Sequence, residues 1–117
     1  MKNTTIEYKG RTYTMTFNLN VMEQIQEEYG SVAEWGELTD DSKGEPNAKA
    51  VIFGLTAMIN EGIEIENEDN EGKEGYIVKK PFNHKQVGRI ISEIGFDKAT
   101  NKLNEAVIND ATVEEKN

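Results

Sequence analysis

The sequence predicts an α+β fold in which an N-terminal β-hairpin packs on a small bundle of about four α-helices. Two short segments near the N-terminus alternate apolar and polar residues, as half-buried strands do. Later segments repeat apolar residues at helical spacing, and glycines or prolines separate these segments. The chain has 117 residues, 36% of them apolar, which suits one domain with one core. We expect this domain over residues 1–110 and a disordered tail over residues 111–117.

The hairpin is predicted from two alternating segments joined by Lys9-Gly10. The residues expected to face the core are Ile6, Tyr8, Tyr13, Met15 and Phe17. Lys9-Gly10 has the length of a two-residue turn, although Asn or Asp is usual at the Lys9 position. An isolated hairpin is marginally stable in water, so its apolar face should rest on the helices.

The first helix is expected from Leu19 to Tyr29, because an apolar stripe at helical spacing ends there before Gly30. Asn20 with Glu23 resembles a capping box, and Asn18 is the alternative cap.

A second capping pattern, Ser31 with Glu34, predicts a short helical turn after Gly30. Its apolar residues are Val32, Trp35 and Leu38. A polar, glycine-containing loop is expected over residues 40–45.

The second helix is predicted as the central one, with Pro46 in its first turn and Gly62 as its end. Its wide apolar face consists of Ala48, Val51, Ile52, Leu55, Met58 and Ile59. Gly54 inside this helix costs about 1 kcal/mol relative to alanine, and such a glycine often marks close helix packing.

Residues 61–75 are predicted to form an acidic loop. The flanking segments 63–66 and 76–79 lean toward strand, which predicts a second ribbon across this loop.

The third helix is expected to begin after Asn83, with Gln86 completing a capping box, and to stop at Gly95. Its inner stripe is Val87, Ile90, Ile91 and Ile94. Asp97 is expected to cap the fourth helix, whose inward residues are Phe96, Ala99, Leu103, Ala106 and Val107.

The net charge of −9 is concentrated in the middle of the chain. Residues 31–75 carry three basic and twelve acidic side chains, whereas the flanking parts are nearly neutral. A field of this sign repels phosphate backbones, so no nucleic-acid partner is expected. No apolar segment approaches the roughly 20 residues needed to span a membrane, and no signal peptide is evident, so we expect a cytosolic protein.

The sequence predicts no catalytic, metal or cofactor site. The only histidine, His84, is expected to be exposed in the first turn of a helix, and there is no cysteine. Residues 67–72 resemble the opening of a calcium loop, but the position of the closing glutamate holds Val78. No glycine-rich phosphate loop occurs. The basic side chains of Lys79, Lys80, Lys85 and Arg89 are interpreted as a solvated face.

The order of elements resembles the tail assembly chaperones of long-tailed bacteriophages and prophages. In that family a strand pair leads to a helix whose Glu-rich end closes on glycine. The matching stretches are Ile6 to Phe17, Phe17 to Gly30, Ala50 to Ile59 and Pro81 to Ile91. The acidic segment 63–75 departs from the family pattern and would be a local insertion.

The resemblance implies a non-enzymatic role in virion assembly. Such chaperones bind and solubilise the helical tape measure protein before the tail tube polymerises, and tube subunits then displace them. It therefore implies the tape measure protein as partner and tail tube subunits as a further partner. Self-association of the chain is compatible with the sequence, which predicts no oligomeric state. It also implies a location in the host cytoplasm and absence from the mature virion.

Four side chains are candidate partner contacts: Val32, Trp35, Met22 and Met58. Val32 and Trp35 stand outside the strong apolar stripes, and a large aromatic there is hard to bury fully. Methionines adapt to imprecise partners. The alternative makes Trp35 a lid on the core and places the methionines inside it.

Two other functions are compatible with the sequence. The acidic middle of the chain suggests an inhibitor that mimics DNA, which requires carboxylates on ordered elements. Most of these carboxylates are expected in loops, which argues against this function. A minor structural tail component is the second alternative, and it would need more β-structure than the sequence predicts.

Overall fold

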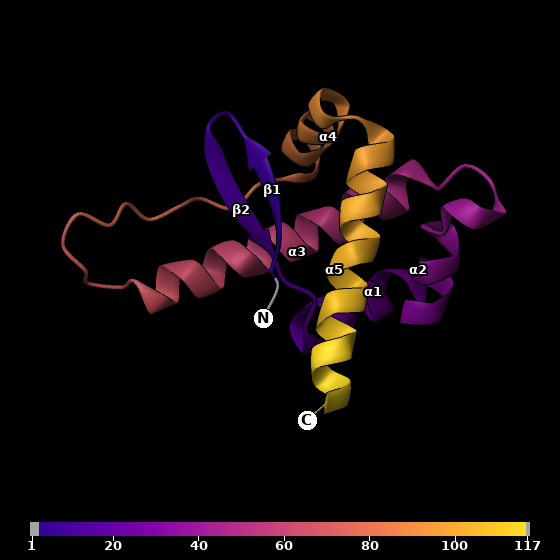
Figure 1. The fold of residues 1–117 in the computed structure, drawn as a ribbon, viewed down its shortest axis with the longest axis horizontal. Helices are drawn as coiled ribbons and strands as arrows, with labels where there is room; N and C mark the ends of the chain where they lie inside the picture. The colour runs from indigo at the N-terminus through magenta and orange to yellow at the C-terminus, as the bar shows by residue number, and fades with distance from the viewer. Residues whose placement is uncertain (1–2, 117) are drawn as a thin grey trace.

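The computed structural model describes the backbone of residues 3–116 and the side chains of residues 3–42 and 44–110. The fold is α+β: a two-stranded antiparallel hairpin precedes five α-helices and one short 3₁₀ helix. Figure 1 shows the hairpin lying across the long helix α3, with α4 above α3 and α1 and α2 below it, while α5 runs down in front of α3 past α1.

The hairpin joins β1 (Thr4–Tyr8) and β2 (Arg11–Met15) in the predicted register, with Ile6 opposite Tyr13. Lys9 and Gly10 have φ values of 51° and 76°. Two positive φ values are the signature of a type I′ turn, whose twist matches that of the strands. The alternation is confirmed, because Ile6, Tyr13 and Met15 are buried.

Helix α1 (Leu19–Tyr29) has the predicted bounds and ends at Gly30. Its cap is Asn18, whose side chain accepts a hydrogen bond from the Val21 backbone N–H, so the capping box of Asn20 is wrong. Asn20 instead donates its amide to the Glu61 carboxylate on α3, 3.1 Å away, and Asn18 donates to the same oxygen at 2.8 Å. Both asparagines therefore bind Glu61, and only Asn18 also caps the helix.

Helix α2 (Val32–Leu38) is the predicted short turn, and Ser31 caps it by accepting from the Glu34 N–H at 3.0 Å. The 3₁₀ helix η1 (Asp41–Lys43) lies within the predicted loop. Trp35 is 2% exposed, and its indole N–H donates to the backbone oxygen of Ala50 at 3.0 Å. Its ring stacks on Phe17 with centroids 6.3 Å apart. Trp35 therefore ties α2 to α3 and to the end of the hairpin.

Helix α3 (Ala48–Asp69) is longer than predicted at its C-terminal end. Asn47 caps it, so Pro46 precedes the cap instead of occupying the first turn. The predicted stop at Gly62 is wrong. A Cβ at Gly62 would overlap the backbone oxygen of Thr14, so this glycine allows β2 to approach the helix. The close approach also brings the Thr16 N–H within 3.1 Å of the Met58 backbone oxygen.

The structure also corrects two predictions for the residues after Gly62, the loop over residues 61–75 and the second β-ribbon across it. Residues 63–66 belong to α3, and an irregular segment without strands follows over residues 70–83. Ile63 is buried against the core, and the glutamates around it are good helix formers, so the helix continues for two further turns. In Figure 1 the end of α3 and the following loop extend away from the rest of the protein.

Helix α4 (His84–Ile94) confirms the predicted capping box of Asn83 and Gln86 and the stop at Gly95. Helix α5 (Phe96–Lys116) begins at Phe96, so Asp97 lies in its first turn and does not cap it. The backbone is helical through Lys116, over residues for which a disordered tail was predicted, whereas Asn117 lies outside the described residues. A helix that is already nucleated extends by one hydrogen bond per residue and needs no apolar stripe to do so.

Helix α5 also holds the hairpin. Asp110 accepts from the Phe17 backbone N–H at 2.7 Å, and the Asn109 amide donates to the Thr4 hydroxyl at 3.0 Å. The hairpin and the helices α1 to α5 all contribute buried side chains to one core.

Candidate functional site

The four predicted contact residues do not form an exposed surface. Trp35 and Met58 are 2% and 0% exposed and belong to the core. Met22 and Val32 are half-buried and pack against that core. The structure therefore corrects the prediction for Trp35 and Met58, because their burial completes the packing of α2 and α3. The alternative of a core tryptophan and a core methionine describes them correctly.

An open furrow lies instead between α3 and α4, and we call it the α3–α4 furrow. Two adjoining hollows of 440 and 680 Å³ share Ile52, Lys85 and Gly88. The remaining lining residues are Lys49, His84, Arg89, Ser92 and Glu93. Its floor is the Ile52 side chain and the bare backbone at Gly88, and its rim is mostly basic.

Gly88 is the informative residue of the furrow. It stands in the middle of α4, where glycine costs about 1 kcal/mol relative to alanine. A Cβ at this position would meet only the Ile52 side chain, at an ordinary contact distance of 3.9 Å. The backbone there has no positive φ. Neither packing nor backbone geometry requires glycine at this position, and its effect is to leave the furrow open.

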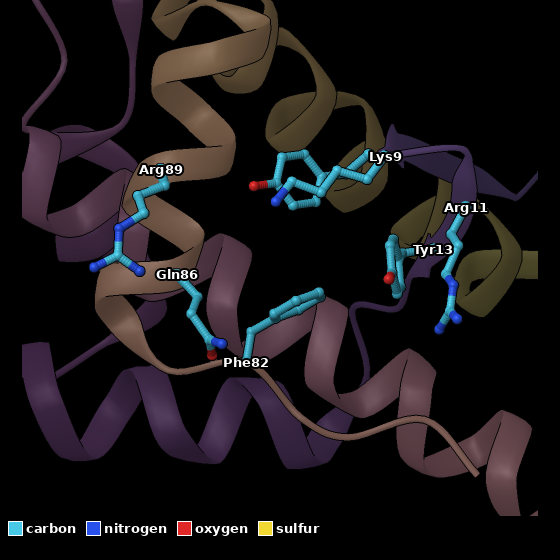
Figure 2. Close-up of a pocket in the computed structure, with 7 residues that line it drawn as sticks. Lys9, Arg11, Tyr13, Phe82, Gln86 and Arg89 are labelled. Carbon is cyan, nitrogen blue, oxygen red and sulfur yellow. The ribbon is translucent and has the colours of Figure 1, made fainter. Parts of the chain in front are cut away.

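A second hollow, which we call the cationic groove, lies on the hairpin side of α4 and has a volume of 380 Å³. It is lined by Tyr8, Lys9, Arg11, Tyr13, Phe82, Gln86 and Arg89. Figure 2 shows Arg89 and Gln86 on the α4 side and Tyr13 and Arg11 on the hairpin side. Lys9 extends from the turn toward α4. Phe82 meets Tyr13 edge to face, with ring centroids 5.2 Å apart.

The charged groups of the cationic groove are all hydrogen-bond donors. Lys9, Arg11 and Arg89 have no acceptor atoms in their charged groups, and none of the described carboxylates lines the groove. The Gln86 side-chain oxygen already accepts from the Asn83 backbone N–H at 2.8 Å, which leaves its amide N–H groups for a ligand. Among the described residues, none of the three cations has an ion-pair partner. The groove is therefore suited to an acceptor with negative charge.

Two asparagines on α3 hold the segment that forms the base of the groove. The Asn60 amide donates to the Phe82 backbone oxygen and accepts from the Phe82 N–H, both at 2.8 Å. The Asn67 amide makes the same pair of bonds with Lys79, at 2.9 and 3.0 Å. Each side chain thus pairs with an extended backbone as a neighbouring strand would.

Replacing Asn60 with alanine is expected to release Phe82 from α3, because two backbone groups lose their partners at once. We expect a loss of about 1–3 kcal/mol of unfolding free energy. Hydrogen exchange at the Phe82 amide should accelerate more than exchange at the buried Val87 amide. Asn60→Gln is the matched control, because glutamine keeps the amide group on a longer side chain. Equal exchange rates at Phe82 in wild type and Asn60→Ala would contradict this role.

Only the second half of the segment that resembled a calcium loop, residues 70–72, is a loop. Asn67 and Asp69 lie in the last turn of α3, and the Asn67 oxygen already accepts from Lys79 and from the Tyr76 hydroxyl. Within the described residues, no group of three or more His, Asp or Glu side chains could hold a metal ion. His84 is exposed, and its ring lies 5.9 Å from that of Phe53.

Sequence reasoning missed both hollows. Lys85 and Arg89 were interpreted as a solvated face, although they stand beside Gly88 on an otherwise strongly amphipathic helix. A glycine inside such a helix, with no turn or cap to explain it, was the available signal.

Between residues 3 and 116, none of the helices combines the length and apolarity that crossing a bilayer requires.

The fold and its two hollows define a small α+β protein with an apolar furrow and a separate cationic groove. Searches of protein-family models, curated proteins and solved structures give no match to this chain. The function is therefore inferred from the surfaces themselves and from the resemblance in the sequence.

Proposed function

We propose that this chain is a non-catalytic tail assembly chaperone that binds an apolar helical segment of a tape measure protein in the α3–α4 furrow. The observation that carries the proposal is Gly88, which leaves the furrow open without any structural need for glycine. A furrow of this kind suits an amphipathic helix, whose apolar face lies against Ile52 and Gly88. The resemblance in the order of elements supplies the identity of the partner.

Charge supports the same assignment. Among the described residues, Lys49, Lys85 and Arg89 border the furrow together with one carboxylate, Glu93, and Lys49 is paired with Glu28 at 3.4 Å. The opposite sign prevails over the whole chain, with a net charge of −9. Copies arrayed along one long helix would repel other coated filaments, which keeps the assembly soluble. On this proposal the protein acts in the host cytoplasm, is displaced by tail tube subunits and is absent from the mature virion.

The test is co-expression with the large coiled-coil-rich protein encoded immediately downstream. The chain should raise the soluble fraction of that protein, and Gly88→Leu should abolish the effect because the new side chain fills the furrow. Gly88→Ala should stabilise the chain alone by about 1 kcal/mol, measured by urea denaturation. Leucine is also a better helix former than glycine, so a Gly88→Leu protein that folds as stably as wild type but does not protect the partner separates function from folding.

Gly36 provides the matched control. It lies in α2, and a Cβ there would meet no atom within 4 Å. Gly36→Leu should therefore leave partner solubility unchanged. If Gly88→Leu protects the partner as well as wild type does, the furrow is not the binding surface. If wild type has no effect on the partner, the chaperone assignment itself is wrong.

One observation favours the acidic inhibitor as a second candidate. The carboxylates of Glu64, Glu66, Glu68 and Asp69 stand on the ordered helix α3, where a loop was predicted. A protein that mimics DNA should bind basic DNA-handling enzymes and lose them at high salt.

The alternative of a minor structural tail component is tested by mass spectrometry of purified phage particles. A structural component should be present in the particles, whereas a chaperone should be missing from them.

A further inference from the structure

We propose that the α3–α4 furrow selects acidic helices. The preferred partner helix places a bulky apolar side chain over Gly88 and carboxylates opposite Lys85 and Arg89. The selectivity rests on the proposed function in one respect, namely that a helix occupies the furrow. It goes further by giving the residue pattern through which the furrow accepts one helix and rejects another.

The α4 side of the furrow consists of two rows of side chains. The inner row lies next to α3, because Gly88 faces Ile52 and the His84 ring lies 5.9 Å from the Phe53 ring. Its members are His84, Gly88 and Ser92, and the outer row is Lys85, Arg89 and Glu93. Residues four apart lie on one face of a helix, so each row follows the helix axis. From residue 84 to residue 93 the furrow extends about 13 Å, the length of two to three turns of a second helix.

The outer row holds two like charges that nothing in the protein neutralises. Lys85 and Arg89 are exposed and stand one turn apart on α4, where like charges destabilise a helix. Among the described residues neither cation has an ion-pair partner, and Glu93 does not pair with Arg89 although it lies one turn away. Lys49 on the opposite side is already paired with Glu28. Carboxylates brought by a partner helix to the outer row would relieve the repulsion between Lys85 and Arg89.

The Arg89 side chain is available to a helix in the furrow. Arg89 lines both the furrow and the cationic groove. Figure 2 shows its guanidinium group directed away from Tyr13, Lys9 and Arg11, which stand on the hairpin side of the groove. The groove therefore does not hold this charge.

The inner row determines where the bulky residue of the partner lies. Gly88 contributes no side chain, and a Cβ at this position would have only Ile52 as a neighbour, at 3.9 Å. A leucine or phenylalanine of the partner can therefore pack on Ile52 directly above the Gly88 backbone. A small residue at that place would leave a void and lose these contacts.

Selection of acidic helices opposes the net charge of the chain, which is −9. At long range this charge attracts basic helices and repels acidic ones. At about 0.15 M salt the screening length is about 8 Å, so the charges beside the furrow dominate once a helix is bound. The two cations thus reject basic helices that the rest of the surface attracts, which is how a binding site gains specificity.

The test uses the full chain and two synthetic peptides of about 20 residues, long enough to form a helix. The acidic peptide has a leucine stripe with glutamates at two positions four apart along its border. Its twin has lysines at the same two positions. We expect the acidic peptide to bind roughly tenfold or more tightly than the lysine twin, measured by fluorescence anisotropy at about 0.15 M salt.

Charge reversal on the chain should invert this preference. The variant Lys85→Glu with Arg89→Glu should bind the lysine twin more tightly than the acidic peptide. The matched control is Lys98→Glu with Lys102→Glu, which makes the same charge change at two positions four apart on α5, outside the furrow. This control should keep the preference of wild type. A control that inverts the preference as well would show that net charge decides it and would overturn the proposal.

A size exchange tests the position of the bulky residue. Gly88→Leu should weaken binding of the acidic peptide roughly tenfold or more, and alanine in place of the central leucine of the peptide should restore binding to this variant. Equal binding of both peptides to wild type, or binding of neither, would overturn the proposal. If both bind equally and both are lost with Gly88→Leu, the furrow still binds helices and only the charge preference is wrong. A chain that binds neither peptide but solubilises the protein encoded downstream would likewise retain the proposed function.

Discussion

Gly62→Ala is expected to destabilise the protein by about 3 kcal/mol, although alanine is the better helix former. The new methyl group would overlap the backbone oxygen of Thr14, and a backbone atom cannot turn aside as a side chain can. Strand β2 would have to move away from α3, which strains the bond from the Thr16 N–H to the Met58 oxygen. Urea denaturation followed by circular dichroism measures the loss.

Gly88→Ala is the control for this substitution, because both glycines lie inside helices. At Gly88 the added methyl group has room, so the same chemical change should stabilise the chain by about 1 kcal/mol. Opposite signs at the two positions are the expected result. A stabilising Gly62→Ala would show that β2 does not rest on α3 as closely as the structure places it.

Trp35→Ala is expected to cost about 3–5 kcal/mol, a large part of the stability of a domain of this size. The indole is 2% exposed, stacks on Phe17 and fills the space over Gly54, where a Cβ would lie 2.5 Å from the ring. Its removal also deletes the hydrogen bond to the Ala50 oxygen. Thermal unfolding should show a strongly lowered Tm or no cooperative transition.

Trp35→Phe separates the packing of the ring from the hydrogen bond to the Ala50 oxygen. It keeps an aromatic ring but loses the N–H group, so the loss should be smaller than for alanine. Because Trp35→Ala should strongly destabilise the fold, a failure of that variant to bind a partner would say nothing about contact with the partner. A stable, cooperatively folding Trp35→Ala protein would contradict the core role of Trp35.

The sequence alone determined the elements whose signals are local. The hairpin followed from alternation and a two-residue turn, α1 from its stripe and Gly30, and α4 from the Asn83 and Gln86 capping box. Each of these signals acts over a few neighbouring residues, so it operates in the isolated chain as it does in the fold. Gly54 inside α3 is a place of close packing, since Trp35 lies against it, but the sequence did not identify the residue that packs there.

Only the tertiary structure decided the features that depend on residues far apart in the sequence. Gly62 has the sequence signature of a helix end, but Thr14 on β2 gives it a different role inside α3. The size of Trp35 suggested that it could not be fully buried, but Phe17 stacks on its ring and Gly54 leaves room for it. The α3–α4 furrow and the cationic groove each combine side chains from separate elements. Spacing along the chain encodes hydrogen bonds within a turn of helix, whereas a surface hollow depends on how whole elements pack.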